Sequence, residues 1–522
     1  MTRLRKMLLE ELQRRNYSEI TTRKYLQYVT VMGQPPLSLE RKALGRAGSY
    51  WQGTRVALGR RVAYDPPVVL PAMAELLRTL RLRDLALLIV GAVIGSGIFL
   101  VPAQVLRQVH GSTGLATLVW LGGGILALLG ALTYGELATM RPSAGGIYIY
   151  VRDAFGRLPA FLYGWSMFLA ISSGAVSALA VAFSTYLGTV IPLGPVASRL
   201  VALASIAAVT VVNVLGTRKS SDLQNWTTLV KVLLLVGITA VLLTRGQHGV
   251  ETASSLWLRE TSGAVSGFGL AMVTALWAYE GWQFVTYSAG EAVNPRRDFP
   301  RALFWGALFL TILYVVADFG YLVALGPQVA ASSDVIASAS LKATVGPWAA
   351  KLVALTILIS VFSGMNSVVL TAPRVFYAMA RDGLFFHKLA EVHPRFRTPA
   401  TAVVALGVWS AGLSLMGSFQ KLIGYAMFVA WIFYGLGGAS VFLLRHREPL
   451  AERPFRVPGY PWTPLVFVAS AFALVVNVIV VTPWDAAKGL VIVALGCPVY
   501  WLLFRRKMKT AAPESARSEA SS

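Results

Sequence analysis

The sequence predicts an all-α integral membrane protein with about twelve transmembrane helices. Composition is the first reason, because 56% of the 522 residues are hydrophobic, only 14% are charged, and the mean hydropathy is +0.61. Apolar runs long enough to cross a bilayer are the second reason, since ~20 helical residues span the hydrocarbon core. The third is that no ten-residue alternating pattern typical of a membrane β-barrel occurs in the sequence.

The apolar runs follow one another along the chain with polar connections between them. Each has the uniform apolar character of a membrane helix rather than the two-faced character of a soluble one. The expected spans cover residues 85–106, 115–139, 160–187, 196–215, 226–243, 264–290, 302–325, 348–371, 400–415, 422–444, 465–481 and 486–504.

Lysine and arginine gather in every second connection. Arg78, Arg81 and Arg83 precede the first span, and further clusters follow the second, fourth, sixth, eighth and tenth spans. This alternation is the positive-inside pattern, and it predicts that both termini are cytoplasmic. The net charge of +23 is then explained by topology and by contact with anionic membrane lipid. We expect a multi-pass protein of the cell membrane.

The first 72 residues do not fit this plan, because they are polar, basic and too short of apolar residues to span a membrane. Residues 7–26 are typical of two short helices around a cap at Ser18, and they resemble the start of the small helical DNA-binding domain of tyrosine recombinases. We expect residues 1–72 to be a fused remnant or an upstream mis-start before Met73, and the alternative is a regulatory extension. The transmembrane domain is expected over residues 73–508, with a disordered tail at 509–522.

The chemistry-bearing residues argue against an enzyme. Cys497 is the single cysteine and the five histidines show no ligand spacing, so we expect no intrachain disulfide, no metal and no cofactor. The spans also contain no recognisable nucleophile arrangement. A membrane-anchored DNA-binding protein is the other alternative, but the basic residues of the N-terminal segment follow no groove-reading plan, and a nucleic-acid partner is not expected.

The first span contains glycines where a continuous helix would not favour them. Gly91, Gly95 and Gly97 lie near its centre with Ser96, and each glycine weakens a helix by ~1 kcal/mol. This favours a helix that unwinds at mid-membrane, which lipid tolerates only where the backbone lines a protein cavity. The alternative is a close helix-packing motif, because small residues at Gly91 and Gly95 also let two helices approach each other.

The sixth span contains a second unusual segment, from Leu276 to Gln283. Glu280 lies within it at a cost of ~3 kcal/mol for an acidic residue at mid-membrane, and Gly281 offers another break. We expect Glu280 to face a cavity, and the alternative is a polar residue that bridges helices. Breaks five spans apart indicate two five-helix halves of inverted topology with a binding site between them.

These segments resemble the amino acid–polyamine–organocation superfamily, most closely the L-type amino acid transporters and bacterial amino acid exchangers. The resemblance covers about residues 82–462 and implies a leucine-transporter-like fold. The matching motifs, in order, are Gly95-Ser96-Gly97-Ile98-Phe99, Tyr134-Gly135-Glu136-Leu137, Pro142-Ser143-Ala144-Gly145-Gly146, Ala278-Tyr279-Glu280-Gly281-Trp282, Gly290-Glu291-Ala292-Val293-Asn294-Pro295, Asn366, Pro373-Arg374-Val375-Phe376, Ala380-Arg381-Asp382-Gly383 and Glu452-Arg453-Pro454-Phe455.

The resemblance implies that the two breaks bind the two charged groups of an amino acid. Backbone N–H groups of Ser96 and Gly97 are expected at the substrate carboxylate. Carbonyl groups of Trp277, Ala278 and Glu280 are expected at the ammonium. Trp277 is expected as an aromatic gate, with an ordinary packed aromatic as the alternative. The implied substrate site comprises Val93, Ile94, Gly95, Ser96, Gly97, Trp277, Ala278, Tyr279, Glu280, Gly281 and Trp431.

A second set of residues is implied to couple transport. Lys231 matches an intramembrane lysine that takes the place of a sodium ion in related carriers, with Ser363 and Asn366 as expected partners. This implies sodium independence, although a buried lysine also exchanges protons readily. The alternative is that Lys231 snorkels to the interface. Asp318 lies where the family often has asparagine, and it is a second possible proton site.

The resulting expectation is a secondary active transporter that moves amino acids by alternating access, with sodium-independent exchange and proton-coupled uptake both open. Neutral amino acids are the expected substrates, and a cationic amino acid or polyamine permease is the alternative. Residues 188–198 contain no cysteine of the kind that animal members use to bind an ancillary glycoprotein. A disulfide-linked partner subunit is therefore not expected.

Overall fold

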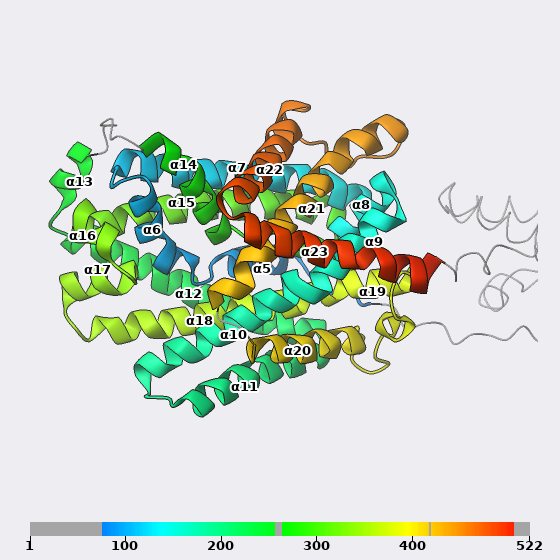
Figure 1. Ribbon diagram of the computed structural model, residues 1–522, viewed down its shortest axis with the longest axis horizontal. Helices are drawn as coiled ribbons and strands as arrows, with labels where there is room; N and C mark the ends of the chain where they lie inside the picture. The colour runs from blue at the N-terminus through cyan, green and yellow to red at the C-terminus, as the bar shows by residue number, and fades with distance from the viewer. Residues whose placement is uncertain (1–75, 256–263, 417–418, 506–522) are drawn as a thin grey trace, which may run out of the picture. The chain divides into compact units, whose positions relative to one another are not determined.

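The computed structural model describes residues 76–255, 264–416 and 419–505. In these ranges every regular element is a helix, and the β-type pairing is an isolated bridge between Leu80 and Ala292 (Figure 1). The predictions for residues 1–72 and 509–522 lie outside the described residues. The helices are α5 (Leu82–Val93), α6 (Gly97–Gln108), α7 (Thr113–Met140), α8 (Ile147–Phe155), α9 (Arg157–Ser166), η1 (Met167–Ile171), α10 (Ser172–Val190), α11 (Pro195–Val214), α12 (Thr217–Arg245), α13 (Gly249–Ser255), α14 (Ala264–Ala278), η2 (Trp282–Glu291), α15 (Pro295–Leu325), α16 (Pro327–Ser332), α17 (Ile336–Val345), α18 (Ala349–Thr371), α19 (Pro373–Arg381), η3 (His387–Ala390), α20 (Ala400–Ser414), α21 (Phe419–Arg447), α22 (Trp462–Val481), α23 (Pro483–Val499) and η4 (Tyr500–Arg505).

Each range expected to span the membrane is mostly helical, and the first and sixth ranges contain an interruption. Nine helices of the described chain are long and apolar enough to cross a bilayer, and the bent pair α5 and α6 forms a tenth span. The expected sixth and ninth spans correspond to α14 and α20, which have 15 residues each. The all-α membrane architecture is therefore confirmed, while the count of twelve and the inverted repeat stay predictions.

Several helices begin earlier than the apolar runs indicated. The fifth span was expected from residue 226, but α12 begins at Thr217, because its polar first turns continue the helix without adding hydropathy. Lys231 therefore lies about 20 Å along α12 at ~1.5 Å per residue. Its side chain is fully buried. The snorkelling alternative for Lys231 is wrong.

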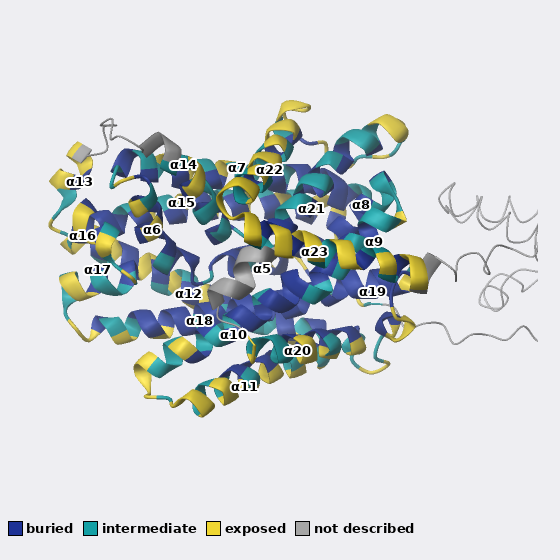
Figure 2. Cartoon of the chain, in the orientation of Figure 1, coloured by how far each residue is buried: buried dark blue, intermediate teal, exposed yellow. Residues whose placement is uncertain are grey.

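Burial is unevenly distributed among the helices, as Figure 2 shows. In the apolar window of the span formed by α18 and α19, 72% of residues are buried, compared with 22% in α11 and in α22. Large apolar side chains on the latter helices are exposed, including Leu200 at 60% and Phe472 at 70%. Such exposure of apolar surface suits contact with lipid rather than water.

The helices form two groups joined by α12. In one group α15 packs along both α7 and α5, and α6 packs along α14. In the other group α10 packs along α18, α11 and α20. Helix α12 contacts both α5 and α18, so it lies between the broken first span and the second group.

Candidate functional site

The first and sixth spans are both interrupted at mid-length. Helix α5 ends at Val93 and α6 begins at Gly97 with a bend of 46° between them. Helix α14 ends at Ala278, and the chain resumes as the 3₁₀ helix η2 at Trp282. The first N–H groups of α6 and the last carbonyl groups of α14 have no partners within their own helices. Ser96 gives α6 no side-chain cap, and the Phe99 N–H donates to the Ser96 carbonyl at 3.1 Å. The N–H groups before Phe99 therefore remain as candidates to bind a ligand.

The two interruptions touch each other. A Cβ atom on Gly97 would lie 2.8 Å from Cβ of Ala278, so the start of α6 lies directly against the end of α14. A Cβ atom on Gly281 would lie 2.9 Å from the carbonyl carbon of Ala92, so the start of η2 lies against the end of α5. Gly281 also has φ of 121°, a conformation that favours glycine. The sequence needs glycine at both positions because two backbones cross there.

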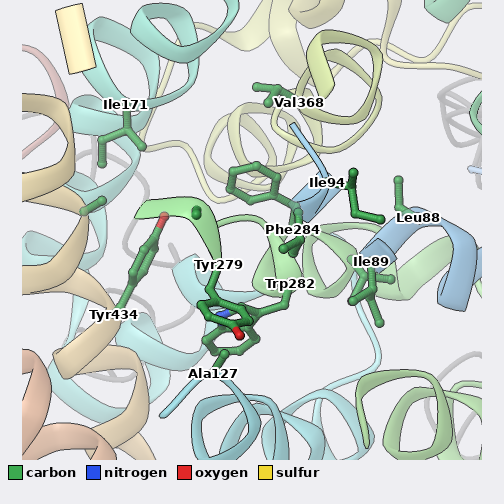
Figure 3. Packing of buried hydrophobic residues seen from close by; sticks show 14 of the residues in the cluster. Leu88, Ile89, Ile94, Ala127, Ile171, Tyr279, Trp282, Phe284, Val368 and Tyr434 are labelled. Atoms are coloured by element: carbon green, nitrogen blue, oxygen red, sulfur yellow. The ribbon is translucent and has the colours of Figure 1, made fainter. Parts of the chain in front are cut away.

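A cavity of about 90 Å³ lies at this crossing. Its walls come from both breaks and from η1, α10, α18, η2 and α21. It is lined by Ala92, Val93, Gly95, Ser96, Gly97, Ile171, Ala175, Leu179, Trp277, Ala278, Glu280, Phe284, Gly364, Val368 and Met427. Figure 3 shows Ile171, Val368 and Phe284 extending from three different elements around this region.

Seven of the residues predicted to bind substrate line the cavity. They are Val93, Gly95, Ser96, Gly97, Trp277, Ala278 and Glu280. The hydroxyl of Ser96 is buried there without a hydrogen-bond partner in the described part of the chain. The Trp277 carbonyl accepts from the Glu280 N–H at 3.2 Å.

The structure places the other four predicted residues outside the cavity lining. Tyr279 is directed away from Ile171 and Val368 in Figure 3, and its hydroxyl donates to the Trp120 carbonyl at 3.0 Å. Gly281 packs against the backbone of α5, and the Ile94 carbonyl accepts a hydrogen bond from Lys231. These three residues shape the break rather than the space within it.

Trp431 lines a second and larger cavity of about 720 Å³ on the side predicted to be external. Arg107 and Asp334 lie at the wall of this outer cavity, and both are exposed. Trp277 and Met427 line both cavities. Trp277 therefore stands between the two spaces, and its role as an aromatic gate stays a prediction.

Lys231 reaches the break of the first span from α12. Its Nζ atom donates hydrogen bonds of 2.6 Å to the carbonyl oxygens of Gly91 and Ile94. The hydroxyl of Ser360 in α18 donates to the same Ile94 carbonyl at 3.0 Å. These are the last carbonyls of α5, where a positive charge is favoured by the helix dipole. The ammonium thus occupies the position that a bound cation would take.

Ser363 and Asn366 belong to a neighbouring network. The Gln224 side chain donates from Nε2 to Ser363 Oγ at 3.1 Å and accepts from Asn366 Nδ2 at 2.9 Å. Asn366 in turn accepts from Asn213 of α11 at 2.9 Å. The eighth-span residue that shares a carbonyl with Lys231 is Ser360, which sequence reasoning missed. Its spacing of three residues from Ser363, on one face of a helix, was the available signal.

Asp318 lies apart from the cavity. Its carboxyl group is buried in α15, close enough to Tyr279 and Tyr321 for an electrostatic interaction with each. The Tyr279 side chain therefore belongs to the surroundings of Asp318 and not to the cavity wall.

Glu280 is held at the cavity by two donors. Tyr434 of α21 donates to Glu280 Oε1 at 2.6 Å, and Gln283 of η2 donates to the same oxygen at 2.5 Å. Tyr134 in turn donates to the Tyr434 carbonyl at 2.9 Å. Sequence reasoning identified Glu280 but not Tyr434, because the two residues are 154 positions apart.

The arrangement suits a small dipolar solute. Donors at the start of α6 favour an anion and acceptors at the end of α14 favour a cation, and both face one cavity. In the described ranges no group of three histidine, cysteine or acidic residues is placed to hold a metal ion.

Comparisons with known proteins give a consistent family assignment. Residues 80–504 match the amino acid permease family. The chain is 31% identical over 423 residues to the serine/threonine exchanger SteT of Bacillus subtilis (strain 168), covering 80% of this chain and 95% of that protein. It is 32% identical to the Asc-type amino acid transporter 1 of Homo sapiens, covering 80% of each chain. It is 30% identical to the b(0,+)-type amino acid transporter 1 of Mus musculus, covering 80% of this chain and 85% of that protein.

Proposed function

The chain belongs to the amino acid permease family, and we propose that it carries small neutral amino acids through the cavity where its two broken spans cross. It is an amino acid transporter and not an enzyme, as its family and relatives are transporters. The identity of its substrate, the way transport is coupled and its orientation in the membrane are proposals.

The observation that carries the proposal is the contact between Gly97 and Ala278. It brings the N-terminal end of one helix and the C-terminal end of another to the two sides of a single cavity. The substrate α-carboxylate binds the N–H groups at Ser96 and Gly97, and the α-ammonium binds the carbonyls of Trp277 and Ala278. Opposite helix ends stabilise opposite charges, so a zwitterion satisfies both at once.

The size and the apolar walls of the cavity favour a substrate with a small, uncharged side chain. A water molecule needs roughly 10–15 Å³ of such space, so a cavity of about 90 Å³ has room for roughly six to nine heavy atoms, the size of a small amino acid. Ile171, Leu179 and Val368 form an apolar wall. Serine, threonine and alanine are the amino acids that this space suits best. The Bacillus relative is a serine/threonine exchanger, which agrees with this proposal.

The position of Lys231 supports sodium-independent transport. Its ammonium already neutralises the carbonyl cluster at the end of α5, so a sodium ion at that place would meet a like charge at short range. We propose exchange of amino acids across the cell membrane, with proton-coupled uptake as the second mode. We also propose that both termini lie in the cytoplasm and that transport needs no disulfide-linked subunit.

Glu280 favours one second candidate, transport of cationic amino acids. Its carboxylate lines the cavity and is not paired with a basic residue in any described contact. A cationic substrate side chain would provide such a partner. A neutral substrate would instead leave the carboxyl group to the hydroxyl of Tyr434 and the amide of Gln283.

Uptake by proteoliposomes tests the proposal. Purified full-length protein is reconstituted, and labelled serine, leucine and arginine are supplied outside with serine, arginine or no amino acid inside. Sodium and a pH gradient are varied independently. We expect serine uptake that depends on internal serine and is unchanged when choline replaces sodium. Faster arginine than serine uptake would favour the second candidate, and strict dependence on sodium would contradict the role of Lys231.

A further inference from the structure

A fully buried ion pair lies on the predicted cytoplasmic side of the cavity. Arg374, near the start of α19, donates from Nε to Glu291 Oε2 at 2.7 Å and from Nη2 to Glu291 Oε1 at 3.0 Å. Neither side chain is exposed to solvent. Among the ion pairs in the described part of the chain, this is the one in which both partners are fully buried. Thr217 at the start of α12 completes the cluster. Its hydroxyl donates to Glu291 Oε1 at 2.7 Å and accepts from Arg374 Nη2 at 2.9 Å.

Glu291 also binds the segment that precedes the first span. Its backbone carbonyl accepts from the N–H groups of Thr79 at 2.8 Å and Leu80 at 3.0 Å. One residue at the end of η2 therefore connects four segments, namely the approach to α5, η2 itself, α12 and α19. These segments include the cytoplasmic parts of both broken spans. A carrier that opens to the cytoplasm must separate some of them.

The two sides of the cavity differ in this structure. The outer cavity of about 720 Å³ reaches Trp277, whereas Glu291 and Arg374 are completely buried. Removing one partner of a buried pair leaves an uncompensated charge, so the closed inner side depends on both residues. The Nη1 atom of Arg374 is buried without a partner in the described ranges, and hydration on opening would satisfy it. That unsatisfied donor limits the stability of the closed arrangement.

We propose that Arg374, Glu291 and Thr217 form a latch that holds the cytoplasmic side closed while the outer cavity is open, and that the latch separates in each transport cycle. They are positioning residues, because they do not touch the substrate cavity. The proposal rests on alternating access in the proposed function, but its test measures sidedness and does not depend on which amino acid is carried.

Two reporter cysteines measure the two sides of the protein. Cys497→Ser removes the single cysteine of the chain and provides the background. Ser288→Cys, between the cavity and the latch along η2, replaces a buried hydroxyl that has no partner in the described residues. Thr274→Cys places the other reporter at the wall of the outer cavity. Each is labelled with a membrane-impermeant maleimide, Ser288→Cys in inside-out vesicles and Thr274→Cys in right-side-out vesicles.

Two latch variants are compared with one control. Glu291→Gln removes the charge, and Thr217→Val removes only a hydroxyl. The control is Thr227→Val, since the Thr227 hydroxyl bonds only to carbonyls of its own helix at Leu223 and Gln224. We expect labelling at Ser288→Cys to become about fivefold faster in the latch variants and labelling at Thr274→Cys to become slower, since a difference near 1 kcal/mol changes a population ratio about fivefold. The control should change neither rate.

The opposite changes at the two reporters separate a latch from a general loosening of the fold. Faster labelling at both positions would mean local unfolding and would overturn the proposal. Unchanged labelling in both latch variants would overturn it as well. If Glu291→Gln is not recovered as folded protein, Thr217→Val decides the result. If the wild-type protein takes up no serine, the proposed substrate is contradicted, but the labelling result stays valid.

Discussion

The Nζ atom of Lys231 lies 2.6 Å from the carbonyl oxygen of Ile94, the first residue of the interruption between α5 and α6. This contact connects the middle of α12 to the end of a half-helix that forms one wall of the substrate cavity. The positive charge satisfies carbonyls that the interruption leaves without helical partners. Lys231 therefore stabilises the break itself, which lies beside the expected carboxylate site.

Lys231→Ala should abolish most transport while leaving the protein folded in the membrane. A hydrogen bond to a charged group contributes ~1.5–3 kcal/mol, so we expect initial exchange rates to fall about tenfold or more. The measurement is serine counterflow in proteoliposomes at equal protein density. Lys351→Ala, an exposed position in α18, is the control. Normal counterflow in the Lys231 variant would remove its proposed role.

Gly97→Ala should close the substrate site. The added methyl group would lie 2.8 Å from Cβ and 2.9 Å from Cα of Ala278, which real Cβ atoms do not tolerate, so α6 and α14 would have to separate. We expect serine binding, measured by isothermal calorimetry or scintillation proximity, to be undetectable. Gly412→Ala is the matched control, because a Cβ atom there would meet no atom within 4 Å. Equal binding by both variants would mean that the crossing does not hold the substrate.

Glu280→Gln should keep neutral transport and reduce any cationic transport. The new amide oxygen can still accept from Tyr434 and Gln283, so the wall keeps its shape and loses only its charge. Serine uptake should stay within about threefold of the wild-type rate. That is less than the tenfold change that ~1.4 kcal/mol would produce. The measured quantity is the ratio of arginine to serine uptake. A large loss of serine uptake with unchanged arginine uptake would contradict the proposed neutral specificity.

Val368→Ala should admit larger side chains. Val368 lines the cavity and is buried, so its truncation enlarges the cavity at that wall. We expect the leucine-to-serine uptake ratio to rise about fivefold, in line with the 1–3 kcal/mol that one methylene contributes in an apolar pocket. Val408→Ala on α20, with 69% of its surface exposed, is the control. An unchanged ratio in the Val368 variant would show that another wall limits substrate size.

Glu136→Gln should destabilise the fold without acting on the site. Glu136 in α7 accepts from Nε and Nη2 of Arg445 at 2.8 and 2.6 Å and from the Val457 N–H at 2.7 Å. Breaking a fully buried pair costs ~3–5 kcal/mol. Glu136 is buried but the Arg445 side chain is 22% exposed, so we expect a smaller loss and a downward shift of a few degrees in thermal unfolding in detergent. The control is Glu452→Gln, whose partner Arg296 is exposed. Exposed pairs contribute little, and a similar shift in both variants would contradict this assignment.

Much of the architecture follows from the sequence because membrane spans depend on local composition. The apolar runs predict where the helices lie, and the glycines near residue 95 and at Gly281 predict where two of them break. Gly95, Ser96 and Glu280 could be assigned to the cavity because glycine and glutamate are costly at mid-membrane unless they line one. Tyr279 lies in the same motif, yet its side chain points away, since adjacent residues in a break face different directions.

The contacts that complete the site were decided by tertiary structure. Lys231 and Ile94 are 137 residues apart, and Ser360 lies 266 residues from the same carbonyl. Tyr434, Gln224 and Arg374 find their partners only after helices from distant parts of the chain pack together. Hydropathy and glycine content are local properties that affect the helix in which they occur. The sequence by itself therefore determined the spans and their interruptions. Hydrogen bonds between helices depend on rotation and depth in the bundle, which packing of the whole chain sets.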